Sequence, residues 1–355
     1  IRVVGSTARN AIANASATAI MIKNEDHYEN QYSDSSANVG EFAAKFPGVL
    51  GNSLLVSMAD ANVFGAWGYK DLFDNAPNTS DYVEGLGGSD DEMHLIIIDS
   101  TGVWTGTPNT VLEKHAYLSK ASDAKNSDGS SAYYKDVINN KSKYIWWMDH
   151  PEGMTNWGNT AMGTAYTQLA DDITVTLSKG VSADTPADGN VIAGLAILSN
   201  DEQYDLSLLP LGKASDPVIE YAIGNVAEVR KDCMVFFSPP LATVLDNVGT
   251  EADDIVSFRD DLPSTSYAVM DSGWKLQYDP YNDKNRWIPL NGDVAGCAVR
   301  TDFTADPWYS PAGFNRGQIK NVIKLAFSPR ATDRDKLYKK GVNPVVSFPG
   351  NGTVL

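Results

Sequence analysis

The pattern of apolar residues changes near residue 180, and this change most constrains the fold. Before it, short unbroken apolar runs such as His94–Ile98 and Tyr144–Met148 are separated by long polar loops. After it, helix and strand signals alternate, as they do where helices cover a sheet. The run Cys233–Phe237, for example, reads as a buried strand with a helical pattern on either side. The sequence therefore predicts an α+β chain with two domains: an α/β layered domain with a mixed sheet, and a β-rich, sandwich-like domain.

The first part of the chain predicts few regular elements. We expect a strand over Ser53–Met58 and a short helix over Tyr133–Ile138. Residues 5–45 are rich in Ala, Asn and Ser and are expected to be mostly irregular, and residues 74–92 read as an acidic, solvated loop. This part of the chain therefore predicts a β-rich layer with long loops.

The second part of the chain carries stronger signals. Pro217 predicts a helix start, with Val218, Ala222, Val226 and Val229 on one face. Ser238-Pro239 predicts a second helix start, and Thr250-x-x-Asp253 resembles a capping box. Tyr204–Leu209 reads as a strand, and a hairpin is expected around Ser272-Gly273.

Two basic helices are expected near the end of the chain. Ile319, Val322, Ile323, Ala326 and Phe327 follow helical spacing, and Thr332-x-x-Asp335 predicts the cap of the next helix, which ends before Gly341. Residues 313–345 carry a net charge of +6, whereas the rest of the chain carries −23. Opposite charges of this kind attract further copies of a chain or another protein. The candidate contact residues are Arg316, Lys320, Lys324, Arg334, Lys336, Lys339 and Lys340. A pair of solvated helices explains the same charges without any contact.

Charge and composition exclude several classes of protein. The 355 residues carry a net charge of −17, which disfavours a nucleic-acid-binding protein because phosphate contacts need Lys and Arg. No apolar run is long enough for a transmembrane helix, and the start of the sequence shows no signal-peptide pattern, so none is expected. Two cysteines are too few for a disulfide scaffold, and the four histidines are too scattered along the sequence to suggest a histidine metal centre. We therefore expect neither membrane insertion nor a cofactor.

Look-alike motifs for catalysis or ligand binding are weak. Leu209–Ser215 lacks the first glycine and the final hydroxyl of a phosphate loop. Asp279–Asn285 lacks the central glycine and the late glutamate of a calcium loop, which favours a polar turn. Cys233 and Cys297 fall in apolar contexts typical of inert core thiols, and His150 reads as a hydrogen-bonded loop residue. No catalytic residue is predicted.

Tryptophans in polar surroundings leave one enzymatic alternative open. Such rings stack on sugars, and paired carboxylates hydrolyse them, so an acidic carbohydrate-active enzyme or lectin is a second hypothesis. Large aromatic side chains also anchor cores and interfaces. The residues concerned are Trp146, Trp147, Trp157, Trp287 and Trp308.

The carboxyl half resembles the contractile tail sheath proteins of large bacteriophages. The similar segments span about 110 residues of unusual composition and keep the family's order and spacing, while weaker similarity covers Lys45–Asn52, the strand at 94–98 and Thr174–Gly180. The strongest segments are Val229–Pro240, Gln277–Leu290, Asp293–Gly296, Arg300–Asp302, Trp308–Gln318, Asn321–Ala326 and Arg334–Tyr338.

The resemblance implies a mechanical role without catalytic residues, metal or cofactor. Family members stack as hexameric rings around a tail tube and contract from a metastable state, which drives the tube through the host envelope. The implied partners are sister copies, the tube, the baseplate and the tail terminator, and the implied location is the virion tail after assembly in the host cytoplasm. A non-viral contractile injection sheath of the same architecture remains a third hypothesis.

The family also implies a division of the chain. The inner α/β domain is expected to comprise residues 1–10 and 180–355, and a β-rich outer domain to be inserted over 11–179. Well-known relatives carry a larger insertion between the first strand and the Phe46-Pro-Gly48 segment, and they continue beyond the end of this chain into a tube-contacting domain. The start at Ile1 and the end at Leu355 are expected to mark a protease-resistant fragment of a longer polypeptide.

Overall fold

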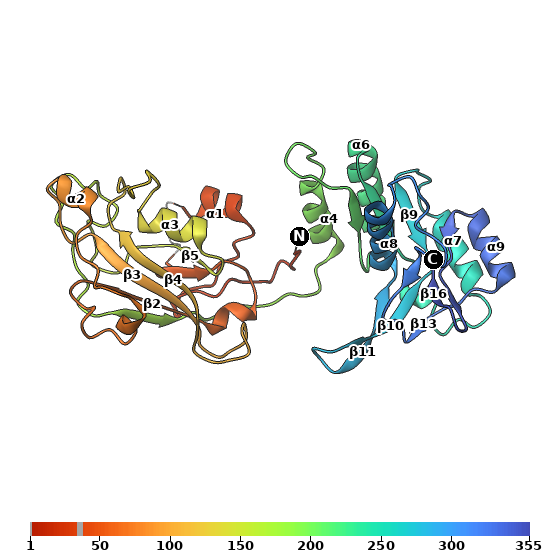
Figure 1. Cartoon of the computed structure of the whole chain (residues 1–355), viewed down its shortest axis with the longest axis horizontal. Coiled ribbons are helices and arrows are strands. Elements are labelled where there is room, and N and C mark those ends of the chain that lie inside the picture. Colours follow the sequence, from red (N-terminus) through yellow and green to blue (C-terminus); the bar gives the residue numbers. More distant parts are fainter. Residues whose placement is uncertain (1, 34–37) are drawn as a thin grey trace. The chain divides into compact units, whose positions relative to one another are not determined.

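The computed structural model describes residues 2–33 and 38–355 and has a mixed α+β fold. The chain divides into two compact units, one comprising residues 4–185 and the other residues 1–3 with 186–355 (Figure 1). Among the described residues, none of the helices combines the length and apolar character needed to cross a bilayer.

The 4–185 unit is built on an antiparallel four-stranded sheet in the order β4-β3-β2-β6. The strands β1 and β5 form a separate antiparallel pair. The central strand β3 is buried along nearly its whole length, which explains its unbroken apolar sequence. The elements of this unit are α1 (Glu25–Gln31), β1 (Phe42–Ala44), β2 (Leu54–Asp60), α2 (Asp81–Gly85), β3 (Glu92–Asp99), β4 (Thr110–Ser119), α3 (Tyr134–Lys141), β5 (Ile145–Trp147), β6 (Ile173–Thr176), and two 3-10 turns at Val49–Ser53 and Lys70–Leu72.

The 186–355 unit is built on a fully parallel four-stranded sheet in the order β14-β9-β8-β7. One mixed sheet was expected; instead, antiparallel strands form two separate sheets, β11-β10-β13 and β12-β16-β15. Its helices are α4 (Asp188–Ile197), α5 (Asp216–Tyr221), α6 (Glu228–Arg230), α7 (Glu251–Asp260), α8 (Asn291–Thr304) and α9 (Ala331–Lys339), with a π-helix at Ala222–Ala227 and a 3-10 turn at Leu241–Thr243. Its strands are β7 (Leu208–Pro210), β8 (Met234–Phe237), β9 (Ala268–Asp271), β10 (Trp274–Asp279), β11 (Lys284–Pro289), β12 (Gln318–Ile319), β13 (Lys324–Leu325), β14 (Val342–Asn343), β15 (Val346–Phe348) and β16 (Gly352–Val354).

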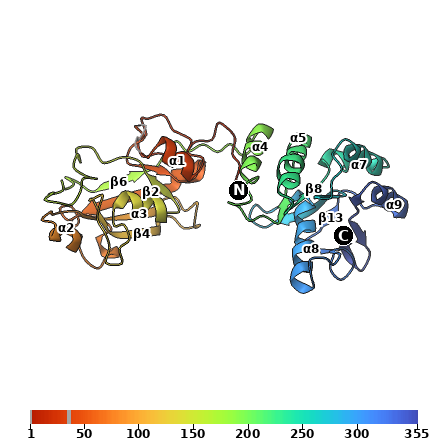
Figure 2. The same ribbon diagram turned by 90° about the horizontal axis from the view of Figure 1, so that it is seen from above.

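Strand β8 shows why the parallel sheet reads as continuous apolar sequence. Val235 and Phe237 join the core cluster that includes residues of α5, the π-helix and α7, whereas Phe236 packs against Val294 of α8. Both faces of the strand are thus covered, in agreement with the predicted buried strand at Cys233–Phe237. Helices α7 and α9 lie side by side in both views of this unit (Figures 1 and 2).

The helix expected over residues 319–327 is absent, because this segment forms two short strands. Ile319 of β12 pairs with Thr353 of β16, and Leu325 of β13 pairs with Lys275 of β10. Three β-branched residues, Ile319, Val322 and Ile323, favour extended backbone, and the two open sheets supply backbone partners. The helical spacing of the apolar residues was therefore misleading here.

The hairpin expected around Ser272-Gly273 is also wrong. Strand β9 joins the parallel sheet, whereas β10 pairs with β11 and β13, so the chain passes from one sheet to another at Gly273. The hairpin of this region is β10–β11, closed by the polar turn at 280–283. No α-helix begins at Ser238-Pro239: the Ser238 hydroxyl donates to the buried Asp271 carboxylate, and only the 3-10 turn at Leu241–Thr243 follows.

Helix faces and caps differ from expectation in three places. The π-helix adds one residue to a turn and so shifts the buried face of the following residues by one position. Val229, expected on the buried face, is exposed, and Arg230 is buried. Helix α7 begins after Thr250 as expected, but the Thr250 hydroxyl donates to Asp254 and no capping box forms. Helix α9 begins after Arg330, whose backbone N–H donates to the Asp333 carboxylate at 3.0 Å, two residues before the predicted cap pair.

Three further segments differ in detail from expectation. Residues 5–45, expected to be mostly irregular, contain the short elements α1 and β1, and residues 74–92, expected to be a solvated loop, contain α2 and the buried Asp91. The strand expected over Tyr204–Leu209 is reduced to β7. Local composition missed these elements because tertiary packing, which sequence spacing does not report, stabilises short segments.

Candidate interaction surface

All seven predicted contact cations lie in the 186–355 unit, but they do not form one helical stripe. Arg316 lies in the loop between α8 and β12, Lys320 follows β12, and Lys324 belongs to β13. The other four belong to α9 and its C-terminal cap: Arg334, Lys336, Lys339 and Lys340. Lys336, Lys339 and Lys340 stand in the last turn before Gly341, where their charge complements the helix dipole.

Two of the α9 lysines already have carboxylate partners on α7. Lys336 forms an ion pair with Asp253, and Lys340 Nζ lies 2.6 Å from Asp260 Oδ2. These exposed pairs are weak individually, but they neutralise part of the basic charge within one copy. The two lysines are therefore less available to a partner than their sequence suggests.

The remaining lysines are exposed and have no ion pair within the described part of the chain. Lys324 Nζ lies 5.5 Å from the ring centroid of Trp287, within reach of a cation–π contact. Lys320 contributes its backbone carbonyl to the buried Lys275 ammonium at 3.0 Å, while its own side chain faces solvent. Lys339 is exposed on α9.

Both arginines of the set lie over aromatic rings. The Cζ atom of Arg316 lies 5.5 Å from the ring centroid of Tyr309, and that of Arg334 lies 5.9 Å from the ring of Phe348. Tyr309, Phe314 and Trp308 are exposed neighbours that the charge pattern alone missed. The sequence did contain an indication of this exposed group: three aromatic residues lie within the short segment 306–317, whose prolines and glycines are typical of a loop.

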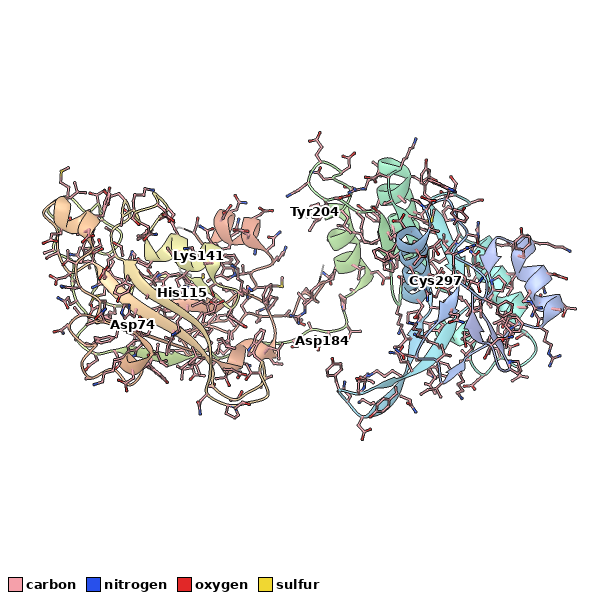
Figure 3. All side chains as sticks on the ribbon, viewed as in Figure 1. Asp74, His115, Lys141, Asp184, Tyr204 and Cys297 are labelled. Carbon is pink, nitrogen blue, oxygen red and sulfur yellow. The ribbon has the colours of Figure 1, made fainter. Side chains whose placement is uncertain are left out.

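The cysteines and His150 have structural surroundings. Burial raises the pKa of Cys233 and of Cys297, which keeps both thiols protonated and unreactive. Cys297 lies on α8 of the 186–355 unit (Figure 3). His150 forms a hydrogen bond with the Tyr134 hydroxyl, and burial lowers its pKa. Within residues 2–33 and 38–355, no cluster of His, Cys, Asp and Glu is arranged to hold a metal.

The two loops that resemble ligand-binding motifs are satisfied by the protein itself. Gly212 donates its N–H to Asn291 Oδ1 at 3.0 Å, and its carbonyl accepts from Asn291 Nδ2 at 2.8 Å, so the Asn291 side chain occupies both backbone polar groups of Gly212. The Asp279 carboxylate accepts hydrogen bonds from Tyr281, Asn282 and Arg286 within the β10–β11 turn. The polar-turn interpretation of residues 279–285 agrees with these contacts.

Most of the tryptophans considered for sugar stacking are core residues. Trp146, Trp147 and Trp157 are each no more than 2% exposed, and Trp287 is half-buried. Trp308 alone of the five is largely exposed, at 78%. Rings that are buried in this way have no free face for a sugar.

Comparison with known proteins gives the family. Residues 189–355 match the family described as the phage tail sheath protein central domain, and all strongly similar segments from Val229 to Tyr338 fall inside this range. The tail sheath protein of Enterobacteria phage T4 is 32% identical over 354 residues, covering 91% of this chain. The chain is homologous to the phage tail sheath proteins. This family is structural and non-enzymatic.

Other sheath proteins match over different extents. The tail sheath protein of Vibrio phage KVP40 is 43% identical over 197 residues, covering 50% of this chain. That of Salmonella phage ViI is 28% identical over 445 aligned residues, covering all of this chain. Because this alignment is longer than the chain, the relative carries residues inserted relative to this sheath homologue.

The chain spans 29%, 66% and 50% of the lengths of the KVP40, ViI and T4 sheath proteins. Among solved structures, the sheath tail protein of Listeria innocua is 9% identical with a TM-score of 0.46, covering 99% of this chain and 68% of the other. A similarity at this level supports no inference about function.

Proposed function

We propose that this chain is part of a contractile tail sheath subunit, which stacks as hexameric rings around a tail tube and shortens to drive the tube through the host envelope. The match of residues 189–355 to the sheath central domain is the observation that carries the proposal. The subunit acts within the virion tail, after assembly in the host cytoplasm. Its partners are sister copies, the tube, the baseplate and the tail terminator.

The two units suggest a division of labour within the subunit. The inner domain comprises residues 1–10 and 180–355, and the β-rich outer domain is inserted over 11–179. The chain passes from one compact unit to the other after residue 3 and after residue 185, so residues 4–10 and 180–185 belong to the 4–185 unit. The grouping of residues 1–3 with 186–355 supports this division, whereas residues 4–10 group with the β-rich unit.

The fold of the 186–355 unit suits mechanical work. Helices cover both faces of its parallel sheet, which makes the unit a stiff body between its interfaces. Contraction needs stiff bodies whose contacts have two alternative packings. A contact between two different surfaces that does not close generates a helical array of such bodies.

Exposed basic charge provides one contact between copies or with the tube. In the full-length sheath protein, reversal of Lys320 and Lys324 to Glu is expected to weaken polymerisation in low salt, because both side chains face solvent without an ion pair in the described part of the chain. Sedimentation at two salt concentrations measures the effect. Filament formation that is unchanged in low salt would remove this role for the two lysines.

Electron microscopy of the full-length polypeptide tests the proposed function directly. We expect hollow tubes or stacked six-membered rings under conditions that favour assembly. A polypeptide that stays monomeric in the presence of tail tubes and baseplates would contradict the proposal.

A further inference from the structure

The loop between α8 and β12 presents aromatic side chains to solvent. Trp308 is 78% exposed, Phe314 52% and Tyr309 48%. Grouped apolar side chains on a folded surface mark contact sites, and Trp, Tyr and Arg are enriched where binding energy concentrates. This loop therefore has the composition of an interface.

Two arginines and a fourth ring extend the aromatic contacts of this loop. Arg316 lies over Tyr309, and Arg334 lies over Phe348, whose ring centroid is 5.3 Å from that of Phe314. Trp308 stacks beside Tyr309 with centroids 6.5 Å apart. The aromatic–arginine patch is defined as Trp308, Tyr309, Phe314, Arg316, Arg334 and Phe348.

Hydrogen bonds hold the patch in shape. Arg316 Nε donates to the Ser310 carbonyl at 2.8 Å, which braces the loop across its width. The Gly313 N–H donates to the Leu355 carbonyl at 2.9 Å, and the Leu355 N–H donates to the Gly317 carbonyl at 2.9 Å. Gly313 has a φ of +96°, which favours glycine. A loop that is already ordered loses little entropy when a partner binds.

The charge of the patch selects an acidic partner. Neither Arg316 nor Arg334 forms an ion pair with a carboxylate in the described chain, in contrast to Lys336 and Lys340. Arg316 uses Nε for the Ser310 carbonyl and Arg334 uses Nη1 for the Pro329 carbonyl, so the other N–H groups of each guanidinium are the donors left for a carboxylate of the partner. The chain itself carries a net charge of −17, so another copy supplies acidic surface in abundance.

We infer that the aromatic–arginine patch is the contact through which one copy of this chain binds the acidic surface of a second copy. The inference rests on the proposed sheath function and deepens it by selecting this patch over the lysines of α9. Carboxylates of the second copy bind the guanidinium groups, while the CH₂ groups of the same acidic side chains pack against Trp308 and Phe314. The contact joins two different surfaces, so it propagates from copy to copy.

Two substitutions in the full-length sheath protein test the inference. Trp308→Ala and Arg316→Glu are each expected to raise the protein concentration needed for assembly by about tenfold or more, because they remove central contacts of the interface. Circular dichroism checks that the variants remain folded. Tyr281→Ala and Lys284→Glu, on the exposed β10–β11 hairpin, are the matched controls and should assemble like the parent protein.

A photo-crosslinking residue at position 308 identifies the partner. We expect a crosslinked dimer whose second peptide comes from another sheath copy and contains Asp or Glu. Crosslinks within one copy or to another tail protein would overturn the inference, as would variants that assemble normally or controls that fail equally. Normal assembly of the parent and the variants would reject the patch and leave the proposed function standing, whereas a parent that never assembles would reject both.

Discussion

Two buried aspartates, one in each unit, respond to burial in opposite ways. Asp99, at the end of β3, accepts hydrogen bonds from backbone N–H groups of residues 102–105 and from the hydroxyls of Ser53 and Thr105. Burial raises the pKa of Asp99, but these donors outweigh it and hold the pKa at about 2. Asp271, at the end of β9, accepts only from Ser238 Oγ at 2.6 Å and Gly273 N at 2.8 Å among the described residues.

The difference lies in the number of donors, because both carboxyl groups are almost fully buried. Burial dominates at Asp271, and with the nearby charge of Asp293 it raises the pKa of Asp271 to about 7. In the 4–185 unit, the buried Asp99 carboxylate is charged and is stabilised by hydrogen bonds from the surrounding N–H and hydroxyl groups. The 186–355 unit keeps a carboxyl group that is favoured when neutral, so the two units should respond differently to pH and to loss of a polar partner.

Removal of Lys120 from the 4–185 unit should have the largest effect. Lys120 Nζ lies 2.9 Å from Asp60 Oδ2 with both side chains almost fully buried, and burial lowers the pKa of Lys120 while Asp60 opposes that shift. Lys120→Met leaves the Asp60 charge buried and unpaired, so the free energy of unfolding should fall by about 3–5 kcal/mol. Urea unfolding followed by hydrogen exchange measures the loss and locates it in this unit.

The matched control is Lys340→Met, which removes a lysine from an exposed pair. Its expected cost is below about 1 kcal/mol. Equal losses for the two variants would show that burial does not control the strength of these pairs.

A pH dependence of the 186–355 unit should be the next largest effect. Since the folded-state pKa of Asp271 is raised to about 7, its contribution to stability is complete below the usual Asp pKa and is lost as the pH rises through about 7. Between pH 4 and pH 8 the free energy of unfolding of this unit should fall by about 3–4 kcal/mol from this group. Asp271→Asn, which mimics the neutral form, should remove most of this dependence. A parent protein that is equally stable at both pH values would contradict the account.

How far the sequence predicted this structure depended on whether local spacing or distant contacts decide each element. The buried strands near His94 and Val235 were predictable, because continuous apolar residues need cover on both faces. The segment at 319–327 was not, because pairing with β10 and β16 overrode its helical spacing. The sequence identified the seven basic contact residues by their charge. It did not show which of them form ion pairs within the chain, because Asp253 and Asp260, the partners of Lys336 and Lys340, lie about 80 residues away in the sequence. The aromatic–arginine patch depends in the same way on Phe348, brought to Phe314 by the fold.

Loss of the Asp99 charge should have the smallest effect of the three. Asp99→Asn replaces one accepting oxygen with an NH₂ group that faces N–H donors, and it removes the advantage of a carboxylate whose pKa is held at about 2. Because a lowered pKa stabilises the fold above the usual Asp pKa, the variant should lose about 2 kcal/mol at pH 7 and progressively less as the pH falls toward 2. Thermal unfolding at pH 7 and pH 3 measures this convergence. A loss of equal size at both pH values would indicate that the shape of the 99–107 loop, and not the charge of Asp99, accounts for the effect, and would weaken the contrast with Asp271.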